Sequence, residues 1–460
     1  MISCETSSDT RVYQTDWLAS NPVFFNEKTG AVSQNVNDVI DYSNVEFHPE
    51  GLRNYLDFGF SVFGQTPIRH VRFLRHSSRL RVDVERRIEI EHLPDPVDDW
   101  MEKLTKEDDV IQLIEQIVGE WEESQKGEIV IPTSGGFDSR LLNLLIRDKS
   151  RIRSFSFGLS KNQSKSSEVV YARALSKILK TRWEQIPLGK YHRYIDDWLR
   201  LYGISTHAHG MYHIEFYRQL RNRTAPGSPV LSGFIGDPWA GSVDVPELQS
   251  EQDLFHLGYS HGMRADSKQC LLPDHRDLRS IYWNENKERL KKPRFRIVEA
   301  MRMKIILLSY LINVPRSLGF KAFAPFIIPE ISLGMLMLPD HRRKNRTWQT
   351  ELFRKNGIDL ESQGVKAQPE NTLNLQAIRL HPPQPLDRKL LREVINPDYV
   401  DWINRGLRPA ATIARWCRGA ARRLRMKRLL GRWGDNPNLL TPYFAYLCLK
   451  PIERVLQSRQ

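Results

Sequence analysis

Between residues 128 and 233, short runs of β-branched residues alternate with segments of helical periodicity. Parallel strands in one sheet need a crossover between them, and that crossover is usually a helix. The alternation therefore predicts an α/β fold built on a parallel sheet. The expected strands are 128–132, 152–158 and 229–233, and the expected helices are 100–124, 140–146 and 167–179.

The flanking regions follow other patterns. Residues 21–35 fit a hairpin, and residues 76–93 alternate charged and apolar side chains as a strand does. Two prolines within residues 93–97 then break the chain. Residues 285–360 predict helices, whereas residues 367–386 contain Pro and Asn and predict a loop.

We therefore expect three parts: a small β-rich region over 1–95, the α/β domain with a mostly helical second half over 96–370, and a basic helical region over 371–460. Apolar residues make up 40% of the chain and charged residues 27%, which is typical of a folded globular protein. A membrane-spanning helix needs about 18 nearly uninterrupted apolar residues. Residues 305–314 are too few, and residues 322–338 contain two prolines and a glutamate, so both predict buried core.

The most informative segment is the Ser-Gly-Gly-Phe-Asp-Ser sequence that joins the first of these strands to a helix. Backbone N–H groups and the positive end of the helix dipole meet there and form a site for anions. Gly135 and Gly136 permit close approach of the backbone, and Ser134 and Ser139 add hydroxyl donors. Asp138 supplies a carboxylate suited to Mg²⁺. The alternative is an ordinary strand–helix turn in which Asp and Ser act only as caps.

This segment lacks the lysine of a Walker A loop. It resembles instead the pyrophosphate loop of the N-type ATP pyrophosphatases, and among them the synthetase domain of the asparagine synthetases and their relatives. Members of that family cleave ATP between the α and β phosphates, adenylate a carboxylate, and let an amine attack the acyl-adenylate. The resemblance implies the parallel-sheet fold of these HUP-like domains, ATP and Mg²⁺ as cofactors, and an AMP-forming amide ligase.

Two further segments match the family in the same order. Residues 153–158 resemble the strand whose backbone contacts adenine, which implies nucleotide contacts at Phe155, Ser156 and Phe157. Residues 231–241 resemble the loop with the pattern G-x-G-A-D-E-x-x-G-G. That match implies a nucleotide contact at Gly233 and a second Mg²⁺-binding carboxylate at Asp237, for which the alternative is a turn residue before proline.

Two basic residues are the candidates for catalysis. Lys321 stands where the family has a glutamate that orients or deprotonates the nucleophile, so the acceptor pocket differs from the family pattern. Lys344 is the best match to the lysine that stabilises the adenylation transition state, and a solvated basic turn is the alternative. We therefore leave the acid open: aspartate, which would give asparagine, or a natural-product or surface-polysaccharide carboxylate.

The nitrogen source is also open. Glutamine-dependent members use an N-terminal cysteine as nucleophile, whereas position 2 is Ile and Cys4 lies two places later. The resemblance therefore implies that residues 1–95 are a truncated, inactive glutaminase remnant. Ammonia, a partner amidase or an amine on the substrate would supply the nitrogen. Four widely spaced cysteines without a C-x-x-C pair favour a reducing cytoplasm.

Charge adds a prediction about partners. The formal net charge is +13, which favours anionic neighbours. About ten Arg and Lys and no acidic residue lie in residues 402–433, with Trp402, Trp416 and Trp433 among them. Peripheral contact with an anionic membrane, an RNA-binding face and a helix docked on the synthetase domain are the alternatives.

Two other functions are alternatives to the ligase. A tRNA-modifying ATP pyrophosphatase would suit the charge, but such enzymes usually carry the loop near the N-terminus and often use cysteine pairs, so we expect no nucleic-acid partner. A nucleotide-binding scaffold without chemistry would suit Lys321 and the missing glutaminase nucleophile. The histidines His207, His209 and His213 line the substrate cleft in our interpretation, with a metal site as the alternative.

Overall fold

The computed structural model describes residues 6–7, 10–259, 261–274, 277–407 and 440–459. Its centre is a sheet of five strands in the order β10-β9-β8-β11-β12, and every neighbouring pair is parallel. The predicted α/β fold with a parallel sheet is therefore confirmed. The strands are β8 (Ile129–Pro132), β9 (Ile152–Ser156), β10 (Arg182–Gln185), β11 (Pro229–Leu231) and β12 (Lys321–Phe323).

The order of these strands creates one crevice. The chain moves outward from β8 through β9 to β10, and then returns to place β11 against the other side of β8, with Val130 opposite Val230. Connections therefore leave the carboxyl ends of β8 and β11 in opposite directions. In open α/β sheets, ligands bind at this switch point. The side chains of Ile129, Val130 and Ile131 are fully buried, as expected for a central parallel strand.

Three helices in the first half of the α/β domain correspond to the predicted ones, and the others were not predicted. The helices of this half are α2 (Glu107–Ser124), α3 (Phe137–Leu145), α4 (Ser167–Leu179), α5 (Ile195–Tyr202), α6 (Met211–Arg221) and α7 (Gly236–Ala240). Helix α4 has the predicted bounds, and α3 begins three residues earlier than predicted, directly after Gly136. Helix α2 begins at Glu107 rather than at residue 100, because three acidic residues in its first turn favour an N-terminus there.

The second half is mostly helical, as predicted. It contains α8 (Asp277–Asn286), α9 (Pro293–Leu308), α10 (Tyr310–Ser317), α11 (Pro329–Leu336), α12 (Asp340–Arg343), α13 (Thr347–Lys355), α14 (Leu373–Leu380), α15 (Arg388–Leu391), α16 (Pro397–Leu407) and α19 (Leu440–Gln457). Helix α14 contradicts the loop predicted for residues 367–386. Its buried Leu373, Ala377 and Ile378 join the core, and such tertiary packing outweighs the Asn- and Pro-rich surroundings.

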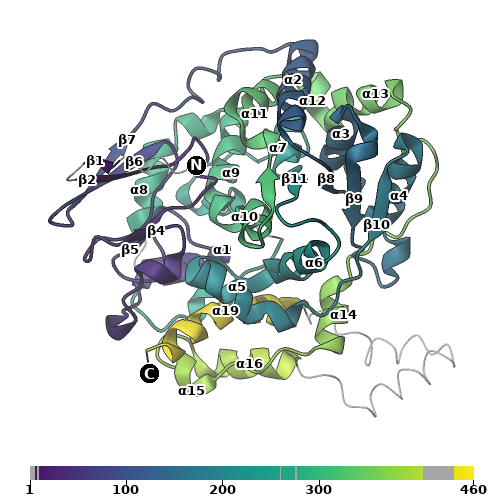
Figure 1. The fold of residues 1–460 in the computed structure, drawn as a ribbon. Coiled ribbons are helices and arrows are strands. Elements are labelled where there is room, and N and C mark those ends of the chain that lie inside the picture. Colours follow the sequence, from purple (N-terminus) through teal and green to yellow (C-terminus); the bar gives the residue numbers. More distant parts are fainter. Residues whose placement is uncertain (1–5, 8–9, 260, 275–276, 408–439, 460) are drawn as a thin grey trace, which may run out of the picture.

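The N-terminal region contains two small antiparallel sheets on the side of the molecule opposite β9 and β10 (Figure 1). One sheet has the order β1-β2-β6-β7 and the other β4-β3-β5, and α1 (Pro49–Phe58) lies between β4 and β5 in sequence. The strands are β1 (Thr6–Ser7), β2 (Thr10–Gln14), β3 (Phe24–Asn26), β4 (Val32–Ser33), β5 (Val71–Phe73), β6 (Ser78–Asp83) and β7 (Ile88–His92). The hairpin over 21–35 is confirmed. Residues 76–93 form two strands, not one, because Arg86 adopts a positive φ in a turn.

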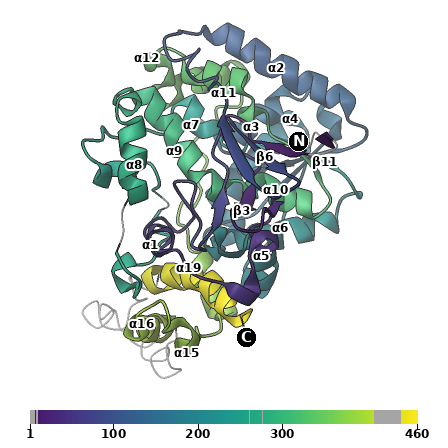
Figure 2. The same ribbon diagram turned by 90° about the vertical axis from the view of Figure 1, so that its left-hand side faces the viewer.

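The main apolar core includes side chains as far apart in sequence as Trp17 and Leu456. A second, smaller cluster, which contains Phe25, Leu80 and Val82, lies in the N-terminal region. Helix α19 lies beside α1 and α16 (Figure 2), and the Tyr55 hydroxyl donates to the Cys448 carbonyl at 3.0 Å. The domain boundaries stay predictions. In the described ranges, no helix is long and apolar enough to cross a membrane. Most of the basic segment over 402–433 lies outside the described residues, so its three alternatives stay open.

Candidate active site

The loop between β8 and α3 turns sharply at Gly135. This residue has a φ of +69°, which side chains rarely adopt, and Gly136 is the N-cap of α3. The Gly136 N–H donates to Ser134 Oγ at 3.2 Å, and Ser139 Oγ donates to the Gly136 carbonyl at 3.1 Å. The first amides of α3 have no acceptor within the helix, so they are available to an anion at the carboxyl end of β8.

Gly135→Ala should destabilise this loop by about 1–3 kcal/mol. A Cβ built on Gly135 would lie 2.3 Å from the Cβ of Tyr171 on α4, and the positive φ adds backbone strain. Urea unfolding measures the loss. Gly127→Ala is the matched control, since its φ is +74° but no atom lies within 4 Å of a Cβ there. If both variants lost the same free energy, the contact with α4 would play no part.

The structure brings Asp138 and Asp237 together at this edge, although 98 residues separate them in sequence. Asp138 lies in the first turn of α3, and Asp237 lies at the start of α7, directly after β11. A Cβ on Gly233 would lie 3.0 Å from the Asp138 Cβ, and one on Gly236 would lie 2.8 Å from its Cγ. Glycine at both positions therefore lets the segment between β11 and the start of α7 lie against Asp138.

The two carboxylates differ in their surroundings. Asp138 Oδ1 is buried and has no hydrogen-bond partner, whereas Asp237 is exposed and its Oδ2 accepts from Ser242 Oγ at 3.1 Å. Burial first, and then the nearby Asp237, raise the pKa of Asp138 to about 8, against the opposing charge of Arg346. A buried carboxylate oxygen without a hydrogen-bond donor is better explained as a ligand for a cation than as a residue that only caps a turn.

This pair fits Mg²⁺. Two carboxylates supply oxygen ligands, and a divalent cation would relieve the cost of holding both charges together. Within the described ranges, no group of three or more His, Cys, Asp or Glu side chains is placed to hold a metal ion. The protein would therefore supply a minority of the ligands, as is usual where Mg²⁺ is shared with phosphate oxygens and water.

Arg140, which sequence reasoning missed, holds the loop from behind. Its side chain is fully buried, it donates to the Gly135 carbonyl at 2.7 Å, and it binds both carboxylate oxygens of Glu361 at 2.7 and 2.8 Å. A bidentate pair of this kind fixes orientation as well as charge. An arginine within an otherwise apolar helical stretch was the only sign of it in the sequence.

Arg346, which was also missed, is a cation close to Asp138. Its charge lowers the pKa of Asp138, and its guanidinium lies 4.2 Å from the centre of the Phe137 ring. Arg342 is instead paired with Glu107 and Glu351. Lys344 is exposed and lines a separate cavity beside α7.

Lys304 is a second cation that the sequence did not reveal. It lies half-buried on α9, near enough to Asp237 for that carboxylate to oppose the lowering of its pKa by burial. No ion pair or hydrogen bond engages its amine within the described part of the chain. Its only sign in the sequence was a lone lysine in the apolar run of α9.

The residues predicted to contact the nucleotide base lie at the end of β9. Phe155 is buried, and Ser156 Oγ donates to the Thr133 carbonyl at 2.6 Å and accepts from Trp183 at 2.8 Å. Phe157 is half-buried and its ring centre lies 5.2 Å from that of Phe216. The side chains of Phe155 and Ser156 are thus engaged in packing, and their carbonyls accept from the N–H groups of Thr133 and Ile186, at 2.8 and 2.7 Å. The contact with the base stays a prediction.

Lys321 is not brought to this edge. It is the first residue of β12, and its N–H donates to the carbonyl of Ser228, which precedes β11. Parallel strands share one direction, so the first residue of β12 lies at the opposite end of the sheet from Asp138 and Asp237. Its side chain is exposed, and its Cε lies 4.0 Å from a Cβ built on Gly227.

The three histidines lie in an aromatic cluster. His209 and His213 both pack against Tyr212, and burial lowers the pKa of His207 and His213 to about 3 and that of His209 to about 4. Neutral imidazoles of this kind suit packing within the fold. The metal alternative finds no support, since no metal-binding group is found among the described residues.

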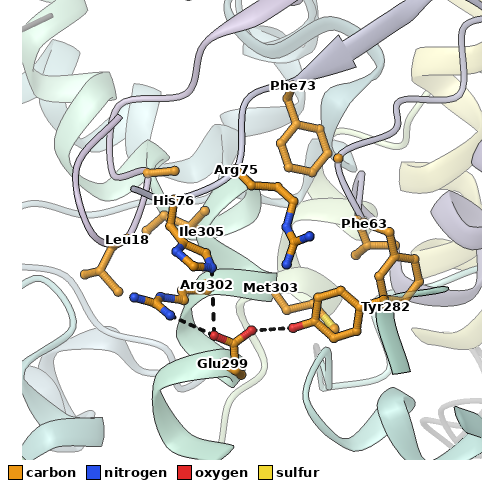
Figure 3. A pocket seen from close by; sticks show the side chains of 13 residues that line it. Leu18, Phe63, Phe73, Arg75, His76, Tyr282, Glu299, Arg302, Met303 and Ile305 are labelled. Carbon is orange, nitrogen blue, oxygen red and sulfur yellow. Dashed lines mark hydrogen bonds and ion pairs between the residues drawn. The ribbon is translucent and has the colours of Figure 1, made fainter. Parts of the chain in front are cut away.

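A second cluster of charges lies between the N-terminal region and α9. Glu299 is at its centre, with Arg302, His76 and Tyr282 around it (Figure 3). Asp95 binds Arg302 through both carboxylate oxygens, at 2.7 and 2.9 Å. The adjoining cavity is only about 30 Å³, the size of one water molecule. This network of ion pairs and hydrogen bonds, with so little free space beside it, connects the N-terminal region to α9.

Among the sequence-predicted residues, those of the Ser-Gly-Gly loop, Gly233 and Asp237 meet at the switch point of the sheet, next to Arg346 and Lys304. Lys321 and Lys344 lie elsewhere. Comparison with known proteins gives no match to a family model and no match to a curated protein sequence.

Proposed function

We propose that the chain is an ATP-dependent, AMP-forming ligase that adenylates a carboxylate and forms an amide. One observation carries this proposal: Asp138, with a buried oxygen that lacks a partner, meets Asp237 beside a helix N-terminus at the switch point of a parallel sheet. The resemblance of the loop to that of the asparagine synthetases and other N-type ATP pyrophosphatases selects the reaction.

Each group has a role that its position supports. The loop amides and the N-terminus of α3 would bind the β and γ phosphates of ATP, and Asp138 and Asp237 would hold Mg²⁺. Bound Mg²⁺ supplies neutralisation and orientation of phosphate charge. Arg140 holds the Gly135 carbonyl, so the loop needs no rearrangement when phosphate binds.

The chemistry is a pair of displacements. A carboxylate oxygen of the acid attacks the α-phosphorus of ATP, and the bond from that phosphorus to the bridging oxygen of pyrophosphate breaks. An amine then attacks the acyl carbon of the resulting acyl-adenylate, AMP leaves with the electron pair of the acyl–oxygen bond, and the amine loses a proton. Negative charge grows on pyrophosphate in the first step, and Arg346, whose charge acts on the neighbouring Asp138, would stabilise it.

ATP–pyrophosphate exchange across a panel of carboxylic acids tests the proposal. We expect exchange with at least one acid, dependent on both ATP and Mg²⁺. Tight ATP binding without exchange for any acid would instead identify a nucleotide-binding scaffold. Ammonia, glutamine with a partner amidase, and amine substrates would then be compared as nitrogen donors. Buried free thiols at Cys270 and Cys448 support a reducing compartment such as the cytoplasm.

Arg346→Gln should lower kcat for exchange about 10- to 100-fold while the protein stays folded. The expected loss is that of one charge at a developing oxyanion, and the half-exposed side chain contributes little to the core. Arg354→Gln is the matched control, because this exposed arginine on α13 is bound only to Asp359, at 3.5 Å. Equal activity in the two variants would show that Arg346 has no role in the reaction.

A further inference from the structure

A large cavity lies beside the proposed active site, between the end of α7, the start of α9 and α12. Its volume is about 840 Å³, within the range of small-molecule sites. Gly241 and Ser242 line it, and the hydroxyl of Ser242 binds Asp237. The cavity therefore begins one short helix away from the carboxylates at the sheet edge.

The lining of this cavity contains two cations without a carboxylate partner. Lys292 is paired with Glu102, and Arg294 is paired with Asp340 at 2.8 Å. Two more basic side chains, Arg343 and Lys344, line the same space. In the part of the chain that the structure describes, neither makes an ion pair.

Arg343 is the more informative of the two, because only 7% of it is exposed. Its guanidinium reaches the carbonyls of Trp239 and Pro238, at 3.3 and 3.5 Å. Asp340 and Asp244, which line the same cavity, attract it without an ion pair. Burial lowers its pKa to about 10, so it stays charged at neutral pH. A buried guanidinium that makes long contacts to carbonyls and no ion pair is stabilised by an anion that binds it directly.

We propose that this cavity binds a second anionic group of the acid substrate, so that the acid carries at least two such groups. The inference rests on the proposed function. Helix α7 has five residues and is about 7.5 Å long, with Asp237 at its start and Arg343 against its end. An acid whose reacting carboxyl lies at the sheet edge can therefore place a carboxylate or phosphate group next to Arg343, with Lys344 at the mouth.

The triphosphate of ATP has the same oxyanion chemistry, so the experiment separates the two sources. Exchange is measured with linear dicarboxylates from succinate to suberate, each against the monocarboxylate of equal length. We expect at least one dicarboxylate to have a KM about 10-fold or more below that of its partner. Lys344→Gln should raise that KM about 10-fold and leave the KM of ATP unchanged. Arg343→Gln should abolish the discrimination.

Two control variants separate the loss of charge inside the cavity from other effects. Lys291→Gln removes the same charge from an exposed lysine that is paired with Glu288 outside the cavity, and it should change neither KM. Arg343→Lys keeps the charge and should retain the preference for dicarboxylates. If Arg343→Gln fails to fold by circular dichroism, Lys344→Gln alone decides the outcome.

Calorimetry separates failure of this inference from failure of the proposed function. Dicarboxylates are titrated into the full chain with α,β-methylene-ATP and Mg²⁺ present. Binding that Lys344→Gln weakens, with no exchange for any acid, would keep the cavity assignment and reject the ligase. Equal KM values for mono- and dicarboxylates, a raised KM of ATP in Lys344→Gln, or neither binding nor exchange with any dicarboxylate would overturn the cavity assignment.

Discussion

Asp138→Asn should lower Mg²⁺-dependent ATP–pyrophosphate exchange by about 10²-fold or more while the fold is kept. The substitution replaces one carboxylate oxygen with an NH2 group and removes the negative charge of a side chain whose Oδ1 is buried without a hydrogen-bond partner, and so weakens the proposed Mg²⁺ site. Asp237→Asn should have a similar effect. Asp148→Asn is the control, since this exposed aspartate only caps the turn before β9.

Stability without Mg²⁺ distinguishes a ligand from a capping residue. The pKa of Asp138 is raised from 3.8 to about 8, chiefly by burial. The folded chain therefore binds more protons than the unfolded chain between these values, and the free energy of unfolding falls as pH rises from 3.8 to 8. Asp138→Asn removes this loss, so the variant should melt at a higher temperature than the wild type at pH 8. A lower melting temperature together with normal exchange would show that Asp138 is a structural cap.

Arg302→Met should cost about 3–5 kcal/mol of the free energy of unfolding. Arg302 is paired with Glu299 (Figure 3) and with Asp95, and each of these three side chains is at most 9% exposed. Its removal leaves the buried Glu299 without its arginine and leaves Asp95 paired with Arg289, at 3.1 Å. It also removes a hydrogen bond to the Trp17 carbonyl at 2.9 Å. Equilibrium urea unfolding measures the loss.

The same network gives this stabilisation a pH dependence. Burial tends to raise the pKa of Asp95, but its hydrogen bonds and charge contact with Arg302 outweigh burial and lower that pKa to about 2. The contribution of the Asp95–Arg302 pair to the free energy of unfolding is therefore present above the ordinary Asp pKa of 3.8, and it is lost as pH falls towards 2. Lys291→Met, at the exposed pair with Glu288, should cost under about 0.5 kcal/mol. A loss below about 1 kcal/mol in Arg302→Met would show that the network is not a stabilising link.

Local patterns in the sequence were sufficient for strands β8, β9 and β11, for helix α4 and for the turn that joins β8 to α3. The spacing of apolar residues predicted α4 at both ends, and the Ser-Gly-Gly turn after a β-branched strand placed Asp138 at a helix N-terminus. These features depend on a few neighbouring residues, whose periodicity and turn chemistry are read directly. Helix α14 was missed because its three buried side chains are stabilised by distant parts of the core.

Only the tertiary structure decided which side chains meet. Asp138 and Asp237 share one edge because β11 packs beside β8, whereas Lys321 is at the other end because it begins its strand rather than follows it. The Arg140 pair with Glu361 spans 221 positions, and no local pattern reports it. Sequence periodicity indicates which face of a helix or strand is buried. It does not indicate which other element packs against that face, because strand order and helix packing depend on residues far apart in the sequence.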